Sequence, residues 1–196
     1  MTTNNRMTQL IRCVSAAAAL ALVPCFASAA ATTAPRSHGE VGTFALGGDL
    51  GLDFGSNGLG AGLRLDGNGY YTLAELAPNV LFDLGGSLAF MHNGCSVGDC
   101  GISKFQISGD GRIRYKLQPN ISLYGDAGLG LVFASGTGTW GGSTTGGVFK
   151  ITGGGMYQVK DQLYLVFEPL GLNFDFGAGT GSYFHYSIVA GVQYRF

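Results

Sequence analysis

The chain has 196 residues, of which 46% are hydrophobic and only 12% are charged, and its formal net charge is −1. This charge balance argues against nucleic-acid binding, because such binding depends on clustered Lys and Arg. The apolar content is high for so little charge, yet no apolar run after residue 40 is long enough for a membrane helix. The apolar residues must therefore be distributed in a repeating pattern.

The first 29 residues have the layout of a secretory signal peptide. Arg6 and Arg12 precede an apolar run over 13–26, and the small residues Ala27-Ser28-Ala29 follow it. The run is shorter than the roughly 20 residues of a membrane-spanning helix, which disfavours an anchor. Lipidation at Cys25 is disfavoured by the proline that precedes it. We expect export and cleavage near Ala29 or Ala31.

Cleavage would leave a short N-terminal segment over 30–40 and one domain over 41–196. Loss of Arg6 and Arg12 reduces the eleven basic residues to nine, against twelve acidic ones. Only Cys95 and Cys100 would remain, and an exported chain meets an oxidising compartment. We expect a disulfide between them. A metal site is the weaker alternative, because only His92 lies nearby and no further cysteine completes a thiolate set. No cofactor is expected.

Eight segments alternate between apolar and polar residues with a period of two, which is typical of strands that separate two environments. The last segment shows it most clearly, since Phe184, Tyr186, Ile188, Val192 and Tyr194 alternate with mostly polar residues. The pattern predicts strands over 41–54, from about 59 onward, and over 80–91, 102–117, 121–134, 148–160, 163–176 and 183–196.

Two of these strands are irregular. The second is interrupted by Gly67-Asn68-Gly69, so its lower end stays open. The seventh changes parity between Phe167 and Phe174. Because Pro169 cannot donate to a ladder and Gly171 permits unusual dihedrals, we predict a β-bulge near 168–171.

The connections between strands are of two kinds. Tight turns are predicted at Pro78-Asn79, Pro119-Asn120 and Lys160-Asp161, whereas 55–58, 92–101, 135–147 and 177–182 are the more variable connections. Short turns at one end and longer loops at the other are typical of outer-membrane barrels. A soluble sandwich or lipocalin-like barrel is the alternative. The polar face has few lysines, and aromatic residues gather at strand ends, which favours the membrane. The predicted fold is an all-β, eight-stranded antiparallel up-and-down transmembrane β-barrel.

The signal sequence, the eight alternating strands and the ending Gly191-Val-Gln-Tyr-Arg-Phe196 resemble the eight-stranded bacterial outer-membrane barrels typified by OmpX, Ail and the OmpA transmembrane domain. The resemblance implies the outer membrane of a Gram-negative bacterium, contact with its lipid and lipopolysaccharide, and assembly by machinery that reads Tyr194 and Phe196. It leaves the activity open, because such barrels include adhesins, structural proteins and lipid-modifying enzymes.

An eight-stranded barrel is filled by its own side chains, so inward charges must pair. Turn positions predict Asp49 opposite Arg64, and both Asp83 and Asp126 opposite Arg112, which would form an ionic belt. The structural interpretation is a plug that blocks the lumen. A narrow pathway for ions or small solutes is the alternative.

His185-Tyr186-Ser187 resembles the His-x-Ser pair of outer-membrane lipid A deacylases. That family has an acid after the serine, and no Asp or Glu follows Asp175 here. Its catalytic pair also faces lipid, whereas His185 and Ser187 share the inward face, so we expect no enzyme. Trp140, the only tryptophan, lies in a polar loop and suits either the membrane interface or an extracellular ligand. The expected function is structural or surface-interacting, as an adhesin or in envelope integrity.

Overall fold

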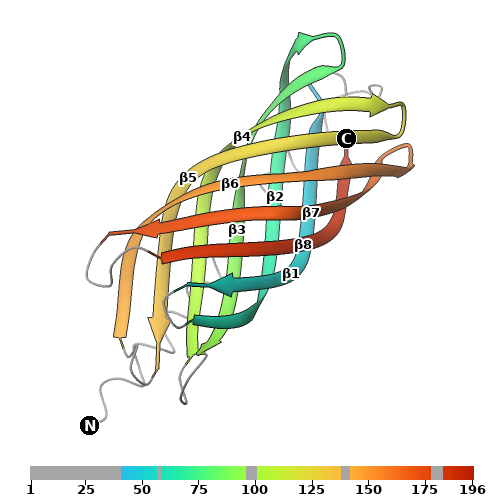
Figure 1. Cartoon of the computed structure of the whole chain (residues 1–196). Coiled ribbons are helices and arrows are strands. Elements are labelled where there is room, and N and C mark those ends of the chain that lie inside the picture. The colour runs from blue at the N-terminus through green and yellow to red at the C-terminus, as the bar shows by residue number, and fades with distance from the viewer. Residues whose placement is uncertain (1–40, 57–58, 96–100, 138–141, 178–182) are drawn as a thin grey trace. The chain divides into compact units, whose positions relative to one another are not determined.

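Eight antiparallel strands make up the part of the chain that the computed structural model describes, which is residues 41–56, 59–95, 101–137, 142–177 and 183–196. Each strand pairs with the next, and the last pairs with the first, so the sheet closes into a barrel (Figure 1). The strands are β1 (Phe44–Gly55), β2 (Leu59–Ala77), β3 (Val80–Cys95), β4 (Gly101–Gln118), β5 (Ile121–Gly136), β6 (Gly142–Lys160), β7 (Leu163–Phe176) and β8 (Tyr183–Arg195).

Several strands are longer than their alternation suggests, whereas β1 begins at Phe44, three residues after its predicted start. β2 continues through Gly67-Asn68-Gly69, because the glycines there pair with β1 and β3 in an unbroken ladder. β6 begins at Gly142, six residues before the predicted start, and β5 extends to Gly136. The predicted loop over 135–147 is therefore mostly strand. Small and polar residues there carry no periodic signal, although their backbones pair in register.

The bulge in β7 is confirmed. The register of β7 against β8 slips between Glu168 and Gly171, and its register against β6 slips at Gly153. The hydroxyl of Tyr186 donates to the Pro169 carbonyl at 2.5 Å. This hydrogen bond supplies a partner for a carbonyl at the irregularity, where the regular ladder is interrupted.

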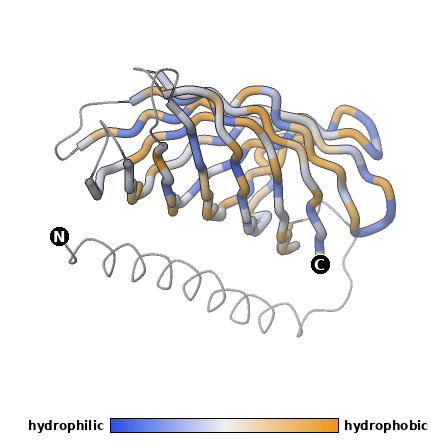
Figure 2. The backbone as a smooth tube through the Cα atoms, turned by 90° about the horizontal axis from the view of Figure 1, so that it is seen from below, coloured by the Kyte–Doolittle hydropathy of each residue, from blue (hydrophilic) through white to orange (hydrophobic). Residues whose placement is uncertain are grey.

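The outward face of the barrel is apolar along each strand, and in Figure 2 the hydropathy colour alternates residue by residue. Large exposed hydrophobic side chains include Leu50, Leu65, Leu84, Ile113, Leu129 and Leu165. Exposed aromatic residues lie near both strand ends, with Tyr71, Tyr115, Tyr157 and Tyr194 towards one end and Phe54, Phe90, Phe133, Phe174 and Phe184 towards the other. Exposure of this apolar surface to water would be unfavourable, whereas the hydrocarbon core of a bilayer and its two interfaces match the apolar band and the aromatic residues at its ends.

The three short turns follow β2, β4 and β6, and the end where they lie is called the short-turn end below. The four longer connections lie at the opposite end of the barrel. No helix in the described ranges is long and apolar enough to cross a membrane. The predicted signal peptide, residues 1–29, lies outside the described part of the chain.

Candidate functional site

The lumen is the candidate site, because the inward positions of all eight strands bring polar side chains together there. These side chains lie out of solvent, although they are ones that usually stay exposed. The buried acidic and basic residues are Asp49, Asp53, Arg64, Asp66, Asp83, Lys104, Asp110, Arg112, Arg114, Asp126, Lys150, Asp175, His185 and Arg195.

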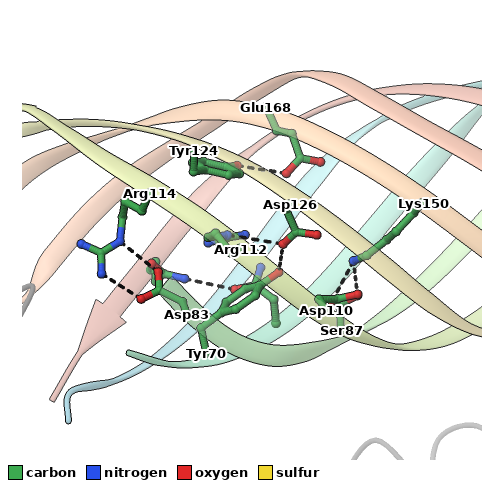
Figure 3. Close-up of polar contacts among 12 residues, drawn as sticks. Tyr70, Asp83, Ser87, Asp110, Arg112, Arg114, Tyr124, Asp126, Lys150 and Glu168 are labelled. Carbon is green, nitrogen blue, oxygen red and sulfur yellow. Dashed lines mark hydrogen bonds and ion pairs between the residues drawn. The ribbon is translucent and has the colours of Figure 1, made fainter. Parts of the chain in front are cut away.

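Arg112 of β4 lies at the centre of the lumen between two aromatic rings (Figure 3). Its guanidinium carbon is 3.7 Å from the ring centroid of Tyr70 and 4.1 Å from that of Tyr124. Its Nε is 3.4 Å from Oδ2 of Asp126, near enough for an ion pair but not aligned for a hydrogen bond. Asp126 also accepts a hydrogen bond from the hydroxyl of Tyr70, and the hydroxyl of Tyr124 donates a hydrogen bond of 2.9 Å to Glu168. Arg112 is thus held mainly by cation–π contact and one carboxylate.

The prediction that Asp83 forms an ion pair with Arg112 is wrong, although the predicted register is correct. The two residues are opposite each other in the β3–β4 register. Asp83 nevertheless binds Arg114, whose Nε and Nη2 each donate to its carboxylate at 3.0 Å, in a bidentate pair (Figure 3). Arg114 is one inward position along the strand, which is within diagonal reach of a long side chain. The rings beside Arg112 hold it away from Asp83.

The predicted Asp49–Arg64 pair is also wrong. Asp49 is opposite Asp66, and Arg64 is opposite Gly51, so the β1–β2 hairpin is centred one residue later than 55–58 implies. Arg64 donates through Nε to Asp66 at 2.7 Å along the same strand. Asp49 accepts a hydrogen bond from Asn68 at 2.6 Å and has no ion-pair partner among the described residues. Two carboxylates therefore face each other, and the arginine on the same strand pairs with Asp66.

Replacing Asp49 with asparagine is expected to stabilise the barrel by about 1 kcal/mol, because like charges directly opposite on paired strands repel. The change keeps a side-chain oxygen for Asn68 and removes the repulsion from Asp66. Urea unfolding in lipid vesicles measures it. Asp83→Asn is the matched control, because the same chemical change there weakens an ion pair and should destabilise. A loss of stability in Asp49→Asn would contradict this assignment.

A further ion pair lay outside the predicted network. Lys150 of β6 binds Asp110 of β4 at 2.8 Å and donates to Ser87 at 2.6 Å (Figure 3). A Cβ atom at Gly128, on the strand between them, would lie 2.9 Å from Lys150 Cε and closer still to Asp110. Gly128 therefore leaves room for this pair. The sequence signal that could have indicated this ion pair is a glycine at an inward position between strands that carry inward charges.

A second cluster lies towards the end opposite the short turns. Lys104 binds Asp175 at 2.6 Å and also contacts Nε2 of His185. The other ring nitrogen of His185 lies 3.0 Å from Asp53, which accepts a hydrogen bond from Asn93 at 2.9 Å. The cluster joins β1, β3, β4, β7 and β8 across the barrel.

This cluster bears on the hydrolase interpretation. His185 has acidic partners, but they precede it in the chain, and its side chain is completely buried. Its polar contacts within the described ranges go to Asp53, Lys104 and Asp175, and none goes to Ser187. The pair lacks the base-to-nucleophile contact of a serine hydrolase.

The remaining predicted residues are placed as follows. Tyr194 and Phe196 lie on the outer surface at the short-turn end, with ring centroids 4.9 Å apart, and Phe196 stacks on Phe44 of β1 across the closing seam. Cys95 ends β3, but its side chain and the whole of Cys100 lie outside what the structure describes. The disulfide stays a prediction, as does the role of Trp140, which also falls outside the described ranges.

The chain was compared with known proteins. No family model and no curated protein matches it. Among solved structures, Neisserial surface protein A has a TM-score of 0.62 at 17% identity, covering 79% of this chain and 99% of its own. Ail of Yersinia pestis, solved with the heparin analogue sucrose octasulfate, has a TM-score of 0.55 at 14% identity, covering 80% and 100%. The outer-membrane enzyme PagL has a TM-score of 0.50 at 12% identity, covering 75% and 97%.

These structures share the architecture at identities too low to transfer an activity, and their names range from a surface protein to an outer-membrane enzyme. The match extends over nearly the full length of each barrel. The chain therefore has the fold of the eight-stranded outer-membrane β-barrel proteins.

Proposed function

We propose that this protein is an outer-membrane barrel with a structural or surface-interaction role, as an adhesin or in envelope integrity, and that it does not conduct. On this proposal residues 1–29 are removed on export. The short-turn end faces the periplasm, and the longer connections face outward. Its partners are outer-membrane lipid, lipopolysaccharide and the barrel assembly machinery. It has no catalytic site and no cofactor.

The observation that carries the proposal is the filling of the lumen. Ion pairs cross it at several levels, and the side chains that form them are almost completely buried. Between them, the rings of Tyr70 and Tyr124 enclose Arg112. A pore needs a continuous file of water, whereas these side chains occupy the cross-section, as the narrow width of an eight-stranded barrel favours.

Conductance in planar bilayers tests this proposal against the narrow pore. The refolded wild-type barrel is expected to give no channel steps. A variant that carries Tyr70→Ala, Arg112→Ala and Tyr124→Ala should conduct, because it removes the central layer, and it would show that inserted barrels are detectable. Discrete steps from the wild type at neutral pH would overturn the plugged lumen.

A surface role is supported by the longer connections at one end. The heparin analogue bound to Ail shows that this fold can carry a sulfated sugar in that protein. In this chain residues 96–100 connect β3 to β4 and residues 138–141 fall between β5 and β6 in the sequence, and Trp140 is a candidate anchor for a ligand. Cells that express the wild type should bind a host or glycan surface better than cells that express Trp140→Ala at equal surface level. Equal binding would contradict a role of Trp140 in ligand binding and would favour a role in envelope integrity. The detergent sensitivity of a deletion strain tests that role.

The lipid A hydrolase is the runner-up. Its best candidates, His185 and Ser187, are both buried inside the barrel. Mass spectrometry of lipid A from cells with and without the protein should show identical acylation. Loss of an acyl chain on expression would overturn the non-enzymatic proposal.

The end of the chain is proposed to carry the assembly signal. Deleting Phe196 is expected to leave most of the protein in the periplasm and sensitive to protease, because the resemblance assigns recognition to the outward aromatic pattern. Fractionation with protease treatment measures this. Phe44→Ala is the matched control, since it removes the ring that stacks on Phe196 but keeps the terminus. A normal membrane yield of the deletion variant would count against the signal.

A further inference from the structure

Arg195 carries a buried positive charge without an acidic ion-pair partner among the described residues. It is the last residue of β8, and its side chain is 2% exposed. The other arginines and lysines that are buried in the described lumen each lie within 4.0 Å of a carboxylate, and Arg195 does not. The two termini of β8 thus differ, since His185 near its start lies between two aspartates.

The groups around the Arg195 guanidinium are mostly apolar. Nη2 donates to Oε1 of Gln193 at 3.2 Å and to Sδ of Met156 at 3.6 Å, and the guanidinium carbon lies 4.9 Å from the ring centroid of Tyr164. Nε has no partner in the described structure. A thioether is a weak acceptor, so in the described structure Gln193 provides the one oxygen that accepts a hydrogen bond from the guanidinium.

Nearby charges do not neutralise Arg195. Arg114 repels it, and Asp83 attracts it. However, Asp83 already holds Arg114 in a bidentate pair. Two guanidinium groups therefore share one carboxylate, and this end of the lumen keeps one positive charge. Burial of a charge without a partner typically costs several kcal/mol.

Arg195 is also close to the rim. Its backbone N–H donates at 2.9 Å to the carbonyl of Gln162, in the short turn between β6 and β7. A small ion that enters from this end would meet Arg195 without crossing the central layer around Arg112. The planar guanidinium group can donate two parallel hydrogen bonds, and two oxygens of a tetrahedral oxyanion can accept them together. A ligand with a single acceptor atom would use only one of these donors.

We propose that Arg195 is the core of a binding site for a small inorganic oxyanion of the phosphate class, at the short-turn end of the lumen. The anion balances the spare positive charge and supplies the acceptor that Nε lacks. Arg114 contributes attraction through its charge, and Tyr164 covers one face of the guanidinium. The Arg195 side chain faces the lumen and not the lipid, so free phosphate rather than a lipid headgroup is its ligand.

The test compares urea unfolding of refolded wild type and Arg195→Gln in neutral detergent micelles at constant ionic strength, with inorganic phosphate as the probe. Above the dissociation constant, each tenfold rise in phosphate should lower the wild-type unfolding equilibrium constant about tenfold, because phosphate binds the folded state. Arg195→Gln should change less than about twofold over the same range. Arg64→Gln, which removes a different lumen arginine, should keep the phosphate response.

An equal response of wild type and Arg195→Gln would show a general salt effect and overturn the site, as would no response in the wild type. If Arg195→Gln does not refold, calorimetric titration of Arg195→Lys with phosphate replaces it. This variant keeps the charge and loses the fork. Binding at least fivefold weaker than wild type supports the proposal, and unchanged binding or no binding by the wild type overturns it.

Discussion

Replacing Arg114 with alanine is expected to lower the free energy of unfolding by about 3–5 kcal/mol, because it strands a buried carboxylate. Arg114 and Asp83 are each about 2% exposed as side chains and share two hydrogen bonds of 3.0 Å. Arg114 also donates to Thr72 at 3.2 Å. The substitution leaves Asp83 with neither its charge partner nor its main donors. Urea unfolding of the barrel refolded in lipid vesicles measures the loss.

The matched control for this change removes the stranded charge. Adding Asp83→Asn to Arg114→Ala should recover much of the lost stability, which gives strong non-additivity in a double-mutant cycle. Lys160→Ala, at an exposed position on the rim, should change stability by less than about 0.5 kcal/mol. Additive effects of Arg114→Ala and Asp83→Asn would contradict the pairing and would restore Arg112 as the partner of Asp83.

Replacing Gly130 with alanine is expected to destabilise the barrel by about 1–3 kcal/mol through overpacking. Gly130 faces inward on β5, opposite Ser108 of β4. A Cβ atom there would lie 2.7 Å from Ser108 Cα and would overlap the backbone carbonyl of Ile107. Backbone atoms cannot turn aside as a flexible side chain can, so the two strands would have to separate. The measurement is again urea unfolding in vesicles.

Gly109→Ala is the matched control for Gly130→Ala. Gly109 is next to Ser108 on β4 but faces outward, and a Cβ atom there meets nothing within 4 Å. The substitution should be neutral or stabilise by up to about 1 kcal/mol, because alanine restricts the unfolded chain. Equal destabilisation by the two changes would show that glycine is needed in these strands for backbone conformation and not for close approach.

The sequence by itself determined the strand count, the faces of the alternating apolar and polar residues, and the bulge. Alternation with a period of two is a local property, so Phe184 and Tyr186 reveal the outward face of β8 without any knowledge of their neighbours. The parity change beyond Phe167 likewise required a slip near Pro169. Prolines and small polar residues marked the turns for the same local reason. Segments such as 142–147 lacked this signal, because glycine and threonine do not distinguish the two faces.

The prediction that Asp126 is opposite Arg112 and pairs with it is confirmed, but only the tertiary structure decided the partners of the other inward charges. A shift of one residue in the centre of the β1–β2 hairpin keeps every face unchanged but moves Asp49 from Arg64 to Asp66. Arg114 shares the inward parity of Arg112, so the sequence pattern does not separate them. The choice depends on the rings of Tyr70 and Tyr124, which come from other strands and enclose Arg112. The pairing of lumen charges is non-local, because long side chains reach diagonally and across the barrel, and closure of the sheet sets what lies within that reach.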